Sequence, residues 1–192
     1  MKKKNFVLMI AVSALLLTSV NINVNAQKFE KGNIDANLMF GGITFWGTGY
    51  HMSMPLISIS GDYGLKDDWG PGVFGVGAYL GIASYKYKYT SDYGFKYTEI
   101  VFAPRATYHY QFIKKLDTYG GVSIGIRIQR GKEYGTYYGL GGYAPTASSS
   151  VFGLGSIFVG AKYYFTNNFA AMGEVGFGTA LLNIGVSWKF GK

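Results

Sequence analysis

The sequence predicts an all-β protein, an eight-stranded antiparallel up-and-down transmembrane β-barrel. The 192 residues include 29 glycines and 18% aromatic residues, and only 15% are charged, whereas soluble domains carry about 7% glycine and about 25% charged residues. Apolar and polar residues alternate with a period of two in segment after segment, which is typical of strands with one apolar face. Beyond the N-terminal region no uncharged apolar run is long enough for a spanning helix, and lipid accommodates only helices and closed barrels, because these satisfy their backbone hydrogen bonds internally.

The first 26 residues have the pattern of a cleavable secretory signal peptide. Lys2, Lys3 and Lys4 precede an uncharged, mostly apolar run over residues 6–20, and Val24-Asn25-Ala26 places small or branched residues at the −3 and −1 positions of a cleavage site. We therefore expect residues 1–26 to be removed and residues 27–192 to form one barrel domain. The alternative is an uncleaved anchor helix, for which the apolar run is short, since a span needs about 20 residues.

The last predicted strand shows the alternation most clearly. Its apolar face carries Leu182, Ile184, Val186, Trp188 and Phe190, and its other face carries Asn183, Gly185, Ser187 and Lys189. One face suits lipid and the other suits a polar lumen. In chain order the predicted strands are Ile34–Phe45, Pro55–Leu65, Val73–Tyr85, Tyr97–Phe112, Tyr119–Arg130, Ser150–Phe165, Phe169–Phe177 and Ala180–Phe190.

The connections sort into short inner turns and longer outer loops, as outer-membrane barrels show. The inner turns are predicted at residues 66–71, 113–116 and 166–168. The outer loops are predicted at residues 47–53, 86–96 and 131–149, with a tight turn near Gly178. Pro104 falls inside a predicted strand. Because proline donates no ladder hydrogen bond, we expect a bulge or a local shift of register there.

Eight charged residues face the predicted lumen. They are the acids Asp35, Asp62, Glu99 and Glu174 and the bases Arg105, Arg127, Lys162 and Lys189. An unpaired buried charge is costly, and eight strands leave an interior just wide enough for side chains to fill. The sequence therefore favours a lumen plugged by paired charges over a conducting pore.

Cations and aromatic residues interleave in two of the predicted outer loops. The candidate contact surface is Lys86, Tyr87, Lys88, Tyr89, Lys132, Tyr134, Tyr137 and Tyr138. Such a surface can bind anionic glycolipid headgroups or a partner through charge and cation–π contacts. The alternative is an extension of the strands beyond the membrane with an ordinary aromatic girdle.

No motif in the sequence supports catalysis, a metal or a cofactor. Residues 70–75 match G-x-G-x-x-G and residues 121–125 match G-x-S-x-G, but each lies in or beside an alternating strand and lacks the strand-to-helix context of a working motif. His51 and His109 are predicted at opposite ends of the barrel, so neither a shared metal site nor a catalytic pair is expected. The chain contains no cysteine. Without Lys2, Lys3 and Lys4 the net charge of +8 falls to +5, and no cluster of Lys and Arg accounts for it, which argues against a nucleic-acid partner.

The alternating strands and the terminal Val186-Ser187-Trp188-Lys189-Phe190 resemble the small eight-stranded outer-membrane barrels, the class of OmpX, OmpW and the OmpA membrane domain. The overall sequence pattern is most similar to that of the outer-membrane β-barrel domain proteins of Bacteroidota-type bacteria. The resemblance implies export to the outer membrane of a Gram-negative cell and recognition of the aromatic C-terminal strand by the barrel insertion machinery, although Gly191 and Lys192 follow the aromatic residue here. Its implied partners are outer-membrane lipid, including lipopolysaccharide, and a monomer is favoured.

The leading functional hypothesis is therefore a non-enzymatic outer-membrane protein with a structural or surface-interaction role. The first alternative is a narrow channel for small or apolar solutes, and the second is an outer-membrane lipid-modifying enzyme.

Overall fold

The computed structural model describes residues 29–43, 50–90, 92–137 and 144–191. The predicted signal peptide, residues 1–26, lies outside these ranges, as do Phe45 and Tyr138. The described residues contain no helix that is long and apolar enough to cross a membrane.

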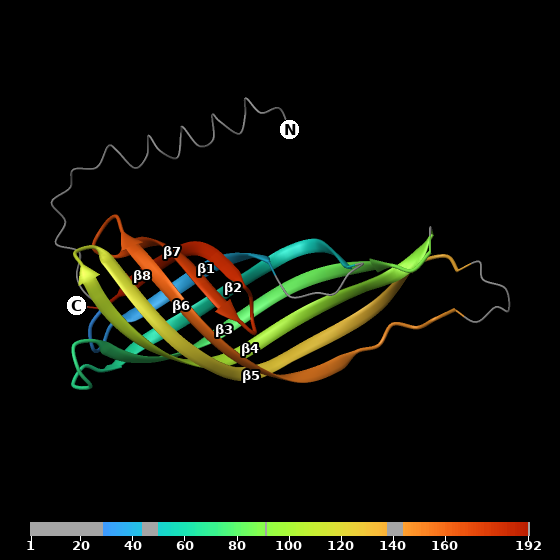
Figure 1. Cartoon of the computed structure of the whole chain (residues 1–192). Helices are drawn as coiled ribbons and strands as arrows, with labels where there is room; N and C mark the ends of the chain where they lie inside the picture. Colours follow the sequence, from blue (N-terminus) through green and yellow to red (C-terminus); the bar gives the residue numbers. More distant parts are fainter. Residues whose placement is uncertain (1–28, 44–49, 91, 138–143, 192) are drawn as a thin grey trace, which may run out of the picture.

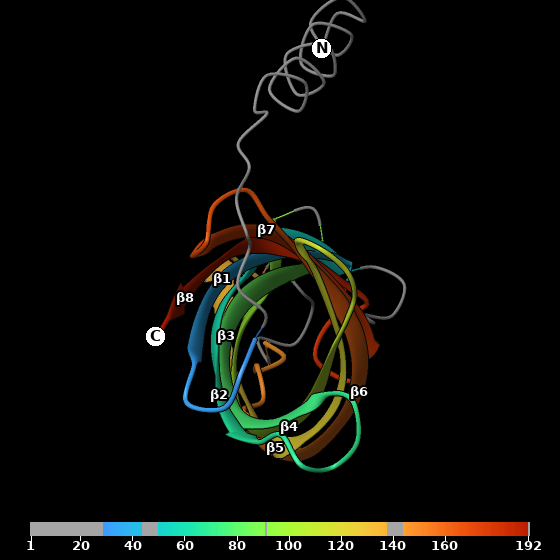
Figure 2. The ribbon, with the colours of Figure 1, turned by 90° about the vertical axis from the view of Figure 1, so that its left-hand side faces the viewer.

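The predicted fold is confirmed: the strands form one closed antiparallel barrel in chain order, and β1 also pairs with β8 to close it (Figures 1 and 2). The strands are β1 (Ile34–Ile43), β2 (Tyr50–Lys66), β3 (Val73–Lys88), β4 (Tyr93–Ile113), β5 (Leu116–Gly135), β6 (Ser150–Tyr164), β7 (Phe169–Phe177) and β8 (Leu182–Phe190).

The period-two pattern of the sequence places alternate side chains inside and outside the barrel. On β5 the side chains of Val122, Ile124 and Ile126 are exposed on the outer surface, whereas Ser123 between them is buried in the barrel. Successive side chains of a strand point to opposite faces. Every strand therefore contributes to an apolar exterior and a more polar interior.

The strands are longer at the outer end than the sequence predicted. The segment expected as a loop at residues 86–96 is mostly strand, because β3 continues to Lys88 and β4 begins at Tyr93. The loops expected from residue 131 and up to residue 53 are shortened in the same way, since β5 continues to Gly135 and β2 begins at Tyr50. In Figure 1, β3, β4 and β5 project beyond the other strands at this end. Their alternation of outward lysines and inward tyrosines keeps the strand period although the segment is too polar for lipid.

The tight turns are where the sequence placed them. Lys114 and Lys115 alone connect β4 to β5, and Lys115 takes a positive φ of 70°. Gly178 in the β7–β8 connection has a φ of 111°, a conformation that a side chain disfavours and glycine tolerates.

The bulge expected at Pro104 is absent. Pro104 lies opposite Ala78 in a regular β3–β4 register. On its other side, the pairs Phe102–Ile126 and Arg105–Ser123 keep one register across it. A shift occurs instead in β2, between Met54 and Ile57. That interval contains Pro55, so the register shift expected of a proline in a strand occurs at Pro55 and not at Pro104.

Candidate functional site: the lumen charges and the outer extension

The middle of the lumen is held by one arginine between two acids. The Arg105 Nε atom lies 3.0 Å from Asp62 Oδ1, and its Nη2 atom lies 3.1 Å from Glu174 Oε2. The contact with Glu174 is also a hydrogen bond, whereas the contact with Asp62 is an ion pair without hydrogen-bond alignment. The three side chains are at most 2% exposed. Three strands that are distant in sequence are thus tied across the barrel interior.

Aromatic side chains surround this arginine. The guanidinium lies 4.2 Å from the centre of the Phe158 ring and 5.8 Å from that of Tyr119. The Tyr119 hydroxyl donates a 3.0 Å hydrogen bond to Glu174. Charged and aromatic side chains are therefore packed together at the centre of the lumen.

A second group of charges closes the inner end. Lys162 Nζ donates a 2.6 Å hydrogen bond to Asp35 Oδ2, and both side chains are fully buried. Lys189, also buried, places its ammonium 4.5 Å from the centre of the Tyr164 ring. The cation–π contact offers the Lys189 charge a favourable surface inside the barrel.

The structure adds an acid that the sequence analysis missed. Asp117 is buried, and its Oδ2 lies 2.8 Å from His109 Nδ1. Asp117 shares the inward parity of Tyr119, but the strand was predicted to begin at residue 119 and so excluded it. Asp117, which pairs with His109, therefore adds a fifth acid to the lumen charges named from the sequence.

His109 also contacts a hydroxyl group, so its imidazole lies between a carboxylate and a hydroxyl. His109 Nε2 is 3.2 Å from Thr107 Oγ1. The order resembles a nucleophile–base pair, which sequence reasoning had not found. The Phe29 ring stacks on the imidazole at 4.0 Å, and all four side chains are buried. The group is packed in the buried interior at the inner end of the barrel.

Phe29 belongs to the segment that precedes β1. In Figure 2 this segment, in blue, lies across the inner mouth of the barrel. Stacking continues inward from Phe29 through His109 to Tyr119, whose ring centre is 5.1 Å from that of His109. A stack of three aromatic rings therefore runs from the inner end into the lumen.

The outer part of the lumen is more open. Arg127 Nε lies 3.6 Å from Glu99 Oε1, and its Nη2 donates a 2.6 Å hydrogen bond to the Gly178 carbonyl. The Arg127 side chain is 27% exposed, so water reaches this pair. All eight charged residues named from the sequence face inward. Among them, Arg127 has the most solvent-exposed side chain.

The outer extension separates the residues of the candidate contact surface onto two faces. Lys86 and Lys88 point outward from β3, whereas Tyr87 between them points inward and stacks near Phe95 with 6.5 Å between ring centres. The other members are Lys132 and Tyr134, which point outward from β5, and Tyr89 and Tyr137, which follow β3 and β5. His51 is exposed opposite Lys86, at the far end of the barrel from His109.

Hydrogen bonds fix the segment after β5 to the extension. The backbone N–H of Ala147 donates a 2.5 Å hydrogen bond to Glu133, and this bond lowers the pKa of the Glu133 carboxyl. The Tyr93 hydroxyl donates a hydrogen bond of 2.5 Å to the Pro145 carbonyl. Burial raises the pKa of the Tyr93 hydroxyl.

Comparison with known proteins identifies the architecture. No family model matches the chain, and no curated protein matches it. Among solved structures, Ail, the attachment invasion locus protein of Yersinia pestis, matches 83% of this chain and 99% of its own at 11% identity, with a TM-score of 0.53. The outer membrane protein OprG of Pseudomonas aeruginosa matches 88% of this chain and all of its own at 10% identity, with a TM-score of 0.51. The fold is that of a small outer-membrane β-barrel.

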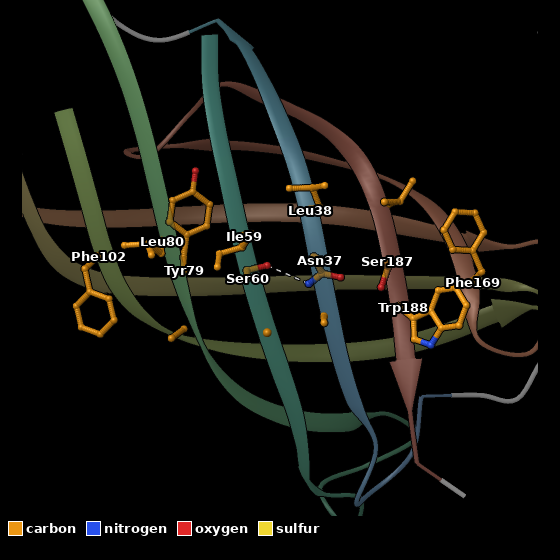
Figure 3. Close-up of a pocket in the computed structure, with 14 residues that line it drawn as sticks. Asn37, Leu38, Ile59, Ser60, Tyr79, Leu80, Phe102, Phe169, Ser187 and Trp188 are labelled. Carbon is orange, nitrogen blue, oxygen red and sulfur yellow. Dashed lines mark hydrogen bonds between the residues drawn. The ribbon is translucent and has the colours of Figure 1, made fainter. Parts of the chain in front are cut away.

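An apolar groove lies on the described exterior of this barrel. Small residues lie side by side along its floor, because Ala36 pairs with Gly61 and Gly61 with Ala78. Leu38, Ile59 and Leu80 form a wall above them, and the groove has a volume of about 610 Å³. Figure 3 shows Trp188 and Phe169 at one end, while Asn37 and Ser60 are joined by a 2.9 Å hydrogen bond. The groove opens on the apolar exterior, which suits lipid acyl chains.

The described residues contain no group of three or more histidine, cysteine or acidic side chains that could hold a metal ion.

Proposed function

We propose that this protein is a closed, non-catalytic barrel of the outer membrane, with a lumen plugged by paired charges and a structural role combined with a surface role. The observation that carries the proposal is the buried contact of Arg105 with Asp62 and Glu174 at the centre of the lumen. Ions crossing an open lumen need hydrated charges, whereas these side chains are almost completely excluded from solvent. The outer-membrane location is supported by the apolar exterior and by the fold shared with Ail and OprG.

The surface part of the proposal is supported by the outer extension. β4 and β5 contain 21 and 20 residues, about twice the 9–11 residues that a tilted strand needs to cross the membrane. The excess length holds charged and aromatic side chains on a paired scaffold outside the apolar band. Such a scaffold presents a contact surface without the entropy cost of ordering a long loop.

A narrow channel for small solutes is the second candidate, and one observation favours it. Buried oxygen atoms of Asn37, Ser58, Asn183 and Ser187 have no hydrogen-bond partner within the described part of the chain. Buried polar groups of this kind recruit ordered water. A hydrated track along β1, β2 and β8 is the route that a small polar solute would take.

Single-barrel conductance in a planar lipid bilayer tests the proposal. The unmodified protein should show no large, steady conductance, and Arg127→Ala should not create ion selectivity. Lys132→Ala removes a charge outside the lumen and serves as the matched control. A steady conductance in the unmodified protein, with a selectivity that Arg127→Ala shifts and Lys132→Ala does not, would replace the plug by the channel.

A further inference from the structure

Three lysines lie side by side on the outward face of the outer extension. The register places Lys86 of β3 opposite Lys96 of β4, and Lys96 opposite Lys132 of β5. All three side chains are exposed. Cross-strand neighbours have Cβ atoms about 4.5–5.5 Å apart. The three ammonium groups therefore form one basic row, which we call the lysine row.

No ion pair of the described residues involves this row. The acids of the strands, Asp35, Asp62, Glu99, Asp117, Glu133 and Glu174, all point inward. No ion pair joins Lys86, Lys96 or Lys132 to an acid among the described residues. Like charges directly opposite each other destabilise a sheet. An anion outside the protein would relieve this repulsion.

The cations gather on one side of the barrel. Arg130 points outward from β5 beside the lysine row, and Lys88 points outward from β3 above it. Lys86 Nζ also lies 5.6 Å from the centre of the Tyr134 ring. The remaining strands place no Lys or Arg on their outward faces at this end, within the described ranges. The charge thus forms a local patch on β3, β4 and β5.

The distance of the patch from the apolar exterior places it relative to the membrane. A row of isoleucines, Ile82, Ile100 and Ile128, pairs across the same three strands and ends the apolar exterior. On β4 the outward apolar and aromatic side chains run from Ile100 to Phe112. At a strand tilt of about 45°, this stretch spans about 28 Å along the membrane normal. That height is close to the apolar band of about 25 Å on outer-membrane barrels. Lys96 lies four residues beyond Ile100, about 9 Å further out, at the depth of the headgroups.

We propose that the lysine row binds the phosphate groups of the glycolipid of the outer leaflet. The ligand is anionic, it lies in the layer that the outward side chains face, and a phosphate supplies several acceptor oxygens to ammonium donors. A lysine near an anionic membrane surface strengthens binding by on the order of fivefold. The inference rests on the membrane placement in the proposed function and does not depend on the plugged lumen.

The test uses the full folded chain in zwitterionic detergent, titrated with bis-phosphorylated lipid A and followed by isothermal titration calorimetry. The triple variant Lys86→Gln, Lys96→Gln, Lys132→Gln should weaken binding by on the order of 100-fold. The loss should shrink as salt is raised, because salt screens exposed charges. The matched control is the triple variant Lys31→Gln, Lys66→Gln, Lys114→Gln, which removes three lysines from the inner end and should keep the affinity within about twofold.

Two further ligands separate the possible sources of the anion. Dephosphorylated lipid A should bind the unmodified chain as weakly as the triple variant binds the phosphorylated form. Phosphatidylglycerol should bind more weakly than lipid A. Equal affinities for phosphatidylglycerol and lipid A would overturn the assignment to the glycolipid, and equal losses in the row variant and the inner-end control would overturn the site itself.

Folding of the variants is checked by heat-modifiable migration on gels and by conductance. A row variant that migrates as a folded, closed barrel while losing lipid A affinity supports the site. A change in conductance with intact affinity would count against the plugged lumen and leave the lysine row standing.

Discussion

Replacing Arg105 by alanine should be the most damaging single change of charge in this barrel. The substitution leaves Asp62 and Glu174 buried without their cation. Removing one member of a buried ion pair costs about 3–5 kcal/mol. Two acids lose their partner here, and the Phe158 ring loses a cation at 4.2 Å, so we expect the upper part of that range.

Arg127 gives the graded comparison. Its side chain is 27% exposed, and its contact with Glu99 is longer, at 3.6 Å. Water then compensates part of the charge that Arg127→Ala leaves behind, so the loss should be smaller than for Arg105→Ala. Lys132→Ala, at an exposed position, should change stability by no more than about 0.5 kcal/mol.

The assay is the free energy of unfolding in urea for the barrel folded into lipid vesicles. The expected order of losses is Arg105→Ala, then Arg127→Ala, then Lys132→Ala. Combining Arg105→Met with Asp62→Asn and Glu174→Gln should recover at least half of the loss, because a buried pair replaced as a unit leaves no uncompensated charge. A loss for Arg105→Ala no larger than that for Lys132→Ala would refute a dry, paired lumen.

Three further outcomes follow from other parts of the barrel. Ile126→Arg, on the lipid face, should destabilise the inserted barrel by about 2–4 kcal/mol near the midplane, whereas Ser123→Ala, facing the lumen, should change it little, and equal losses in urea unfolding would contradict the assignment of the faces. Gly77→Ala should prevent a regular β2–β3 ladder because the added Cβ overlaps the Gly61 carbonyl, whereas Gly153→Ala meets no atom within 4 Å and should be close to neutral in the same assay. The lowered pKa of Glu133 means that its bond to Ala147 stabilises the fold above the ordinary pKa of 4.5 and is lost as pH falls through the folded value. The protection factor of the Ala147 amide, which corrects for the pH dependence of intrinsic exchange, should therefore be high at pH 6 and fall in acid, and Glu133→Gln should flatten that profile.

The sequence determined which way each side chain of the barrel faces. Alternation is a local property with a period of two, so the inward placement of Asp35, Arg105 and Lys162 and the outward placement of Ile126 could be predicted without any tertiary contact. The turn at Lys114 and Lys115 was equally local, because two polar residues interrupt two alternating runs.

The strand ends were less predictable. Strand extensions outside the membrane lose the apolar face that marks a strand in lipid, so the segment around Lys88 and Tyr93 looked like a loop. Asp117 was missed for the same reason, since it lies at the beginning of a strand next to a polar turn.

Only the tertiary structure decided which charges meet. Glu174 lies 69 residues from Arg105 and Asp35 lies 127 residues from Lys162, and the alternation assigns all four to the lumen without choosing among the possible pairs. The choice depends on the register of each hairpin and on the closure of β1 against β8. The lysine row has the same origin, because a slip of one residue in either hairpin would turn a lysine from the outer surface into the lumen. The direction in which a side chain points is determined by its position along its own strand. The charge that it pairs with is determined by the register of hydrogen-bonded strands across the sheet.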